Sequence, residues 1–312
     1  MHIRRRWWIV GITCGALVAP TGIASATTLD PDAAEAALTA LADVPVEFDR
    51  STQVGQVDAG TYVSDTSAGT TSIDVPETGT PVVTLDTAGR SPLAVALPTT
   101  PTQDPELTQD GTVLLAGSSP TDVSIAVLPL SDGKVSVQTV IPARESEHRF
   151  TYDFQGDAAP QLRPDGGIDL VVKSDGVSMV VGTVDAPWAF DATGTSVPTE
   201  YVVAGSLVTQ LVHASEANTY PIVADPTYGH TYGIPTVYLN RAETQQAAGD
   251  TGGVMIICGL VGLWNPVVGF LCAGNAYNIN QGARYANDRG MCVKLLVAPG
   301  AVATQAFSKN CS

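Results

Sequence analysis

Cysteine is missing from residues 15–257, so no disulfide bond and no cysteine-based metal site can form within most of this 312-residue chain. Apart from Cys14, the cysteines lie in the last quarter, at Cys258, Cys272, Cys292 and Cys311. They lack the C-x-x-C spacing that is typical of zinc sites. Their distribution predicts a small disulfide-stapled module that follows a long region without such bonds.

Basic side chains are scarce as well, with 15 Lys and Arg against 31 Asp and Glu and a net charge of −16. The imbalance lies in residues 27–227, which hold 7 basic and 28 acidic side chains. Residues from 228 onward hold 5 basic and 3 acidic side chains. An acidic surface repels phosphate groups, so we expect no nucleic-acid partner.

The familiar catalytic motifs are missing: there is no G-x-S-x-G turn, no H-E-x-x-H helix and no glycine-rich phosphate loop. The histidines beyond residue 26 (His148, His213 and His230) lie far apart in the sequence, and His230 has no second histidine at metal-ligand spacing. Glu145 and Glu147 beside His148 leave a hydrolase with scattered acidic residues as an alternative. We expect a non-enzymatic protein without catalytic residues, cofactor or metal.

The N-terminus shows the order of features found in secretory signal peptides. Arg4-Arg5-Arg6 form a basic start, an apolar stretch covers 9–18, and Ala24-Ser25-Ala26 matches an A-x-A cleavage site. We therefore expect a signal peptide over 1–26, cleavage near Ala26, and a secreted or cell-envelope protein. A retained membrane anchor is the alternative, which the short apolar stretch and the following Pro20 and Gly22 disfavour.

Residues 27–110 predict a short helix followed by an irregular β-rich region. Asp30 and Pro31 suit the cap and the first turn of a helix, and an alanine-rich run extends to Ala42. Thr, Ser, Gly and Pro are frequent beyond it, and the short apolar pieces at 81–85 and 93–97 predict strands.

The strand signal strengthens over 111–227. Apolar or alternating runs rich in β-branched residues occupy 112–116, 123–128, 135–141, 168–173 and 177–184. Asp-Gly pairs at 132–133, 165–166 and 175–176 suit tight turns next to these runs. The pattern predicts an antiparallel β-sandwich. Each aspartate stands alone, which favours structural turns over calcium loops, because calcium needs several closely spaced oxygen ligands.

Four pieces of sequence form a distinctive pattern, APWAFDATG (186–194), VPTEY (197–201), LVTQLV (207–212) and YPIVADPT (220–227). This segment resembles a β-rich module of secreted actinobacterial proteins, whose hallmarks are a PWA-DA-G--VPT turn and a YP-VADPT terminus. The resemblance implies a β-rich exported protein and supplies no catalytic residue. From the residues themselves we expect Trp188 in the core, a turn at Asp191–Gly194, and a last strand between Pro221 and Pro226.

Residues from 228 onward predict the stapled module. Tyr228–Gly233 suits a joint between domains, and a strand is expected at 236–239. Asn240 suits the cap of a helix that has Glu243 at its third position and ends at Gly249, a variant of the capping box.

The run 254–273 is almost wholly apolar and allows three interpretations: a transmembrane helix, a membrane-active peptide or a buried helical hairpin. In one continuous helix Cys258 and Cys272 would lie about 21 Å apart, beyond the reach of a disulfide. A fold at Asn265-Pro266, with Asn265 as the cap of a second helix, brings the two cysteines together. The glycines at 259, 262 and 269 would let the helices approach closely. The pattern favours the hairpin.

Four cysteines allow three pairings. Pairing of nearest neighbours, Cys258 with Cys272 and Cys292 with Cys311, fits the hairpin and ties down the tail. We expect the second helix to continue to about Asp288 and a strand to follow at 291–297. This segment resembles C-terminal modules of the same actinobacterial proteins, which carry a capped helix, a Cys–Cys helical hairpin and a G-CV-L strand.

We predict a mainly β, antiparallel sandwich-like fold followed by a small disulfide-stapled α+β module with a helical hairpin. The expected division is a signal peptide (1–26), an N-terminal helix and irregular β-rich region (27–110), an antiparallel β domain (111–227) and the module (228–312). The favoured function is a secreted or envelope-associated, non-catalytic binding or structural protein that contacts the cell envelope or a membrane surface through its module. A membrane-active antibacterial protein and a hydrolase with an unrecognised site are the alternatives.

Overall fold

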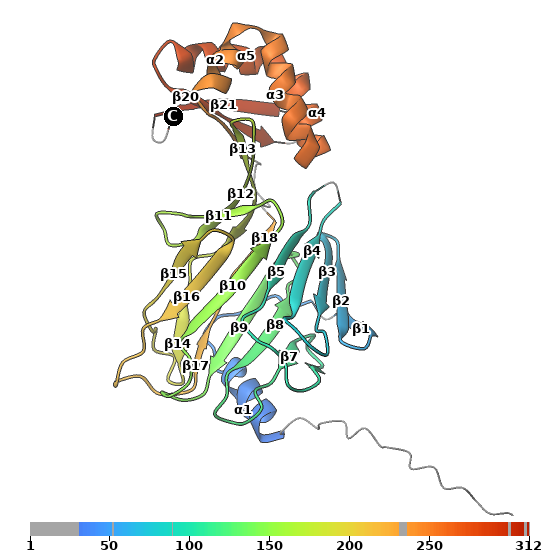
Figure 1. Cartoon of the computed structure of the whole chain (residues 1–312), viewed down its shortest axis with the longest axis vertical. Helices are drawn as coiled ribbons and strands as arrows, with labels where there is room; N and C mark the ends of the chain where they lie inside the picture. The colour runs from blue at the N-terminus through green and yellow to red at the C-terminus, as the bar shows by residue number, and fades with distance from the viewer. Residues whose placement is uncertain are drawn as a thin grey trace, which may run out of the picture.

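The computed structural model describes residues 31–51, 53–88, 90–230, 236–298, 301–308 and 311. The signal peptide expected over 1–26 and the cap expected at Asp30 lie outside these residues. The described part has a β-rich body that carries the C-terminal module at one end, and helix α1 lies at the opposite end of the body (Figure 1). The predicted fold class, mainly antiparallel β followed by a helical, disulfide-stapled module, is confirmed.

The smaller sheet of the body is antiparallel and has the order β1-β2-β3-β4-β5-β10-β16-β15. Its strands are β1 (Val54–Asp58), β2 (Thr61–Thr66), β3 (Gly69–Asp74), β4 (Val82–Asp86), β5 (Leu93–Ala96), β10 (Arg149–Gln155), β15 (Thr199–Ala204) and β16 (Leu207–Val212). β5 pairs with β10, Val95 lying opposite Phe154. The division expected after residue 110 therefore falls inside one body, because strands from both sides of it share this sheet.

The larger sheet has the order β21-β20-β19-β13-β18-β9-β8-β7-β6, with β11 and β12 attached beside β13 and with β14 and β17 attached beside β9. In the body its strands are β6 (Glu106–Leu107), β7 (Val113–Leu115), β8 (Ser124–Pro129), β9 (Val135–Ile141), β11 (Ala159–Leu162), β12 (Ile168–Ser174), β13 (Val177–Val184), β14 (Ala189–Asp191), β17 (Ile222–Ala224) and β18 (Thr227–His230). β9 and β13 begin and end at the predicted residues. The joint predicted from Tyr228 onward begins as strand β18, while 231–235 lie outside the described residues.

The main hydrophobic core lies between the two sheets and includes the fully buried Phe150, Tyr152 and Tyr228. A second, smaller core lies where helix α1 (Pro31–Ala42) covers the outer face of the larger sheet. The predicted N-terminal helix is therefore present, and its alanines Ala37 and Ala40 pack over this face. The half-buried Trp188 packs against the edge of the same core and contacts Phe48 and Phe190, so it packs on the sheet without being enclosed in the interior.

The predicted turn at Asp175-Gly176 closes the hairpin between β12 and β13. Both residues have positive φ, 46° for Asp175 and 82° for Gly176, as a two-residue hairpin turn of this kind requires. Gly176 also lies against the Glu243 carboxylate and the Asn240 side chain, and a Cβ atom there would collide with both. The backbone angle favours glycine here, and the missing Cβ atom leaves room for these two side chains.

The C-terminal module begins with β19 (Thr236–Leu239), which pairs with β13 of the body and with β20. It continues with α2 (Arg241–Gly249), α3 (Thr251–Trp264), α4 (Pro266–Gly274), α5 (Ala276–Asn287), β20 (Cys292–Ala298) and β21 (Ala301–Phe307). A third core forms between these helices and their strands and includes Val177 and Met179 of β13. β13 is thus part of both the body and the module.

The sequence pieces APWAFDATG (186–194) and YPIVADPT (220–227) lie side by side in this fold. β14 pairs with β17, and the Oδ1 atom of Asp225 accepts a hydrogen bond from the backbone N–H of Trp188 at 3.0 Å. Asp191 accepts hydrogen bonds from the backbone N–H groups of Thr193, Thr195 and Thr219, which makes the predicted turn at Asp191–Gly194. The motif aspartates therefore hold the backbone of two neighbouring strands together.

Asp225 and Asp191 are expected to respond to pH in opposite directions. Burial raises the pKa of the fully buried Asp225 carboxyl well above its usual range. The folded protein then holds a proton that the unfolded chain has lost, so this group lowers stability as pH rises above about 4, by up to about 1.4 kcal/mol per pH unit. We predict that Asp225→Asn, which keeps an acceptor for Trp188, is more stable at pH 7–8 and has a flatter pH profile in urea unfolding.

Asp191→Asn is the matched control. The hydrogen bond from the Thr193 hydroxyl, with those from Asn218 and the backbone, lowers the pKa of the Asp191 carboxyl. Its stabilisation is present above the unfolded pKa and is lost as pH falls, so this variant should be less stable at pH 7 and approach the parent in acid. An unchanged pH profile in Asp225→Asn would contradict the assignment of a proton to Asp225.

Candidate functional site

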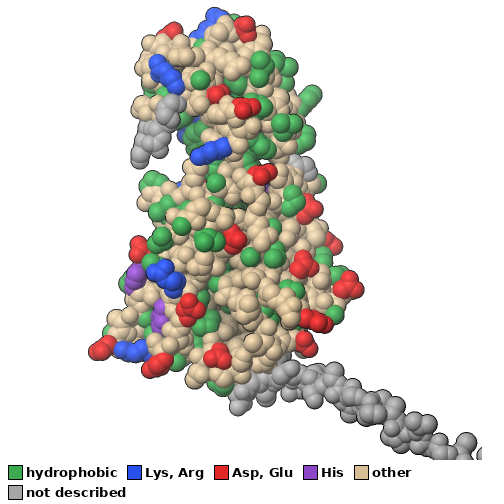
Figure 2. Space-filling model, in the orientation of Figure 1, with side chains coloured by type: hydrophobic (Ala, Val, Ile, Leu, Met, Phe, Trp, Pro, Cys, Tyr) green, Lys and Arg blue, Asp and Glu red, His purple; other side chains and the backbone are tan. Residues whose placement is uncertain are grey.

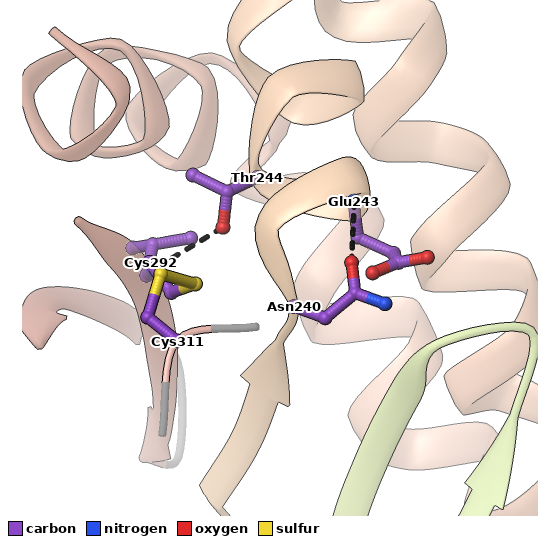
Figure 3. The surroundings of a disulfide bond; sticks show 6 residues. Asn240, Glu243, Thr244, Cys292 and Cys311 are labelled. Atoms are coloured by element: carbon purple, nitrogen blue, oxygen red, sulfur yellow. Dashed lines mark hydrogen bonds between the residues drawn. A yellow bond between two sulfur atoms is a disulfide. The ribbon is translucent and has the colours of Figure 1, made fainter. Parts of the chain in front are cut away.

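The four predicted disulfide cysteines form two bonds in the predicted nearest-neighbour pairing. Cys258–Cys272 joins α3 to α4 with 5.4 Å between the Cα atoms, and Cys292–Cys311 joins β20 to the C-terminal tail with 5.5 Å. Figure 3 shows the second bond beside the start of α2, where Oδ1 of Asn240 accepts the predicted capping hydrogen bond from the Glu243 N–H at 3.0 Å. Thr244 accepts a hydrogen bond from the Val293 N–H at 3.2 Å, which ties α2 to β20.

The apolar run folds back on itself at the predicted position. The Asn265 N–H donates to the Val261 carbonyl at 2.9 Å, and the Asn265 side chain accepts from the Val268 N–H at 3.1 Å. One residue thus ends α3 and caps α4, while Pro266 occupies the first turn of α4, where no N–H is needed.

Two of the three glycines expected between the helices make the close contact. A Cβ atom on Gly269 would lie 2.5 Å from the Cα of Gly262, so the backbones touch at this pair. A Cβ atom on Gly259 would meet nothing within 4 Å, and Gly259 is exposed to solvent. The close approach lets the Cys258–Cys272 bond form between the helices.

The second helix does not continue to about Asp288 as expected; it breaks at Asn275. The Asn275 side chain donates to the Leu271 carbonyl at 2.9 Å, and α5 starts in a new direction. That direction packs α5 on α2, where the Asn280 amide donates to the Ala247 carbonyl at 2.6 Å and Arg284 donates to the Ala248 carbonyl at 2.9 Å. Tertiary packing against α2 therefore decides the break.

The hairpin of α3 and α4 is buried on one side and exposed on the other. Val254, Ile257, Val261 and Val268 lie in the core of the module. Five large apolar side chains point to solvent and are 50–78 % exposed; this apolar face consists of Met255, Ile256, Leu263, Val267 and Phe270. Hydrophobic side chains gather on the flank of the module where Figure 1 places α3 and α4, as Figure 2 shows.

The apolar face carries no charge, because α3 and α4 contain no Asp, Glu, Lys or Arg. A contiguous exposed apolar surface of this kind on a folded protein marks a contact with a partner or a membrane. Within the described residues, no helix has both the length and the apolar character needed to cross a membrane. The face is our candidate functional site.

Two of the three histidines considered above, His148 and His213, lie close to each other in the body. His148 and His213 line one shallow hollow of about 490 Å³, an approach that their sequence separation hid. His148 is held between the Ser146 carbonyl (2.7 Å) and the Tyr220 hydroxyl (2.8 Å), and His213 lies 3.1 Å from Glu200. Glu145 and Glu147 are exposed on the neighbouring loop. These contacts serve the packing of the loop and couple neither histidine to a nucleophile among the described residues.

His230, considered above as a metal ligand, is buried in the body. Its ring nitrogens lie 3.3 Å from the Leu85 carbonyl and 3.4 Å from the Val181 carbonyl. Burial lowers the pKa of His230, which favours the neutral ring. Among the described residues, no group of three or more His, Cys, Asp or Glu side chains is arranged to hold a metal ion.

Comparison of the chain with protein-family models gives no match, and comparison with curated proteins gives none either.

The contact between Gly262 and Gly269 predicts opposite effects for two alanine substitutions in the same hairpin. Gly269→Ala forces the helices apart and should lower the free energy of unfolding by roughly 1–3 kcal/mol. Gly259→Ala adds a methyl group in open space on a helix and should raise it by up to about 1 kcal/mol. Urea unfolding of the oxidised chain followed by circular dichroism measures both. Equal effects of the two substitutions would refute the close contact.

Proposed function

We propose that this protein is an exported, non-catalytic binding protein whose C-terminal module attaches it to an anionic lipid surface. The observation that carries the proposal is the apolar face of Met255, Ile256, Leu263, Val267 and Phe270. By area, moving half of that exposed surface out of water contributes roughly 6–10 kcal/mol before the cost of ordering the complex is subtracted, which is enough for reversible attachment to a membrane interface.

The charges of the two parts support a lipid partner and an orientation. The module has 5 basic and 3 acidic residues from 228 onward, while residues 27–227 have 7 basic and 28 acidic residues. Anionic lipids attract the first region and repel the second, so the module faces the lipid and the body stays in solution. The aromatic rings of Tyr277 and Tyr285 on α5, 68 % and 56 % exposed, suit the polar boundary of the bilayer.

The backbone of the α3–α4 hairpin is also suited to contact with lipid. In lipid, backbone N–H and C=O groups without a hydrogen-bond partner cost free energy. At the turn, the Asn265 N–H donates to the Val261 carbonyl, and the Asn265 side chain accepts from the Val268 N–H. The Cys258–Cys272 bond keeps the helices together when water no longer drives their association.

Export is supported by the leader pattern over 1–26 and by the disulfides, which persist in oxidising compartments. The resemblance to secreted actinobacterial modules supports it as well. The hydrolase alternative gains no support from His148, because contacts with Ser146 and Tyr220 occupy both of its ring nitrogens.

Co-sedimentation with lipid vesicles tests the proposal. The oxidised chain should bind vesicles of equal parts phosphatidylglycerol and phosphatidylcholine and bind pure phosphatidylcholine more weakly. Leu263→Gln with Phe270→Gln should weaken binding at least about tenfold, because these side chains are the most exposed of the apolar face (77 % and 78 %). Val202→Gln with Leu207→Gln is the control, since it removes two exposed apolar side chains from the body (46 % and 40 %).

Equal binding by the parent and the Leu263/Phe270 variant would refute a lipid contact through this face. A different result would assign the face to a second copy of the protein: the parent chain does not bind vesicles and sediments as a dimer, and the Leu263/Phe270 variant sediments as a monomer. Release of a trapped dye from the vesicles would favour the membrane-active alternative over attachment.

A further inference from the structure

A cleft of about 490 Å³ lies between α1 and the outer face of the larger sheet, at the end of the body away from the module. Residues along α1 line one side of it, and Val140, Phe190, Pro221 and Val223 from the larger sheet and its loops also line it. The volume is within the range of small-molecule sites in proteins.

The cleft exists because α1 faces the sheet with alanines. Ala33, Ala37 and Ala40 are buried against the sheet, and the exposed Ala36 lies on the edge of the cleft. Side chains of one carbon atom leave space that leucine or valine would fill, and most of the lining is apolar.

The charged residues of the lining all have the same sign. Glu35, Asp43, Asp122 and Asp191 line the cleft, and no Lys, Arg or His lines it among the described residues. Asp43 directly follows the C-terminus of α1, where the helix dipole is negative and the last turn has no basic residue. The hydrogen bonds to Asp191 hold it as a carboxylate. An aromatic ring, that of Phe190, completes a lining that attracts cations.

We propose that the cleft between α1 and the larger sheet binds a small amphiphilic cation, an apolar body that carries one ammonium group. The apolar body fills the space left by the alanines, and the ammonium group lies at the acidic rim beside Asp43 and Asp122. Anionic and neutral amphiphiles of the same size match the apolar lining of the cleft, but they lack the positive charge that its carboxylates attract. The site is independent of the lipid contact proposed for the module and lies at the opposite end of the molecule.

Isothermal titration calorimetry of the oxidised chain tests this with three probes of equal tail length below their micellar concentrations: octyltrimethylammonium, octyl sulfate and octyl glucoside. The cation should bind at one site at least about tenfold more tightly than either of the other two. Asp43→Asn with Asp122→Asn should weaken the cation at least about tenfold and leave octyl glucoside unchanged. Ala36→Trp, at an exposed helix position, should abolish binding of the cation by filling the cleft.

Two control variants test whether the cation binds elsewhere on the protein. Asp58→Asn with Asp74→Asn removes two exposed charges from the smaller sheet and should leave the affinity for the cation unchanged. Leu263→Gln with Phe270→Gln should also leave this affinity unchanged, and weaker binding of the cation by this variant would assign it to the apolar face of the module and overturn the proposal. Equal affinity for cation and anion, or parent-like binding by either Ala36→Trp or the Asp43/Asp122 variant, would overturn the proposal. So would the absence of cation binding by the parent chain.

Discussion

Strand β13 pairs with three other strands: with β12 along its length, with β18 at Gly182–Val184 and with β19 at Val177–Met179. Its side chains enter two cores, Val184 in the body and Val177 and Met179 in the module. The module is therefore attached by sheet pairing. The register of β19 on β13 positions Asn240 and α2, and through them the disulfide-clamped hairpin. A change in this pairing would move the whole module.

Segments 186–194 and 220–227 have a structural role in the body. The Trp188 N–H and the buried Asp225 join β14 to the end of β17, and Asp191 ties the β14 turn to Thr219. Phe190, Asp191 and Pro221 from the same segments also line the α1 cleft. Residues that stabilise two short strands thus also shape a wall of a candidate ligand site.

The two proposed contact surfaces differ in their chemistry. The apolar face of the module is uncharged, and its exposure lowers solubility in water unless a partner covers it. The α1 cleft is concave, apolar within and acidic at the rim. They lie at opposite ends of the molecule, so a body held to a surface by the module leaves the cleft open to solution (Figure 1).

The sequence by itself determined features that depend on neighbouring residues. It located β9 and β13, the Asp175-Gly176 turn, the Asn240 cap and the break at Asn265-Pro266, because turn geometry, capping and alternation act over a few residues. It also indicated the disulfide pairing, once the hairpin brought Cys258 and Cys272 together. Only the tertiary structure decided that β5 joins β10, that the helix breaks again at Asn275, and which side of α3 and α4 faces water. A helix that is apolar on every face contains no signal for which side is exposed. Strand pairing, or a cleft between distant segments, depends on contacts between residues far apart in the sequence, which no local pattern encodes.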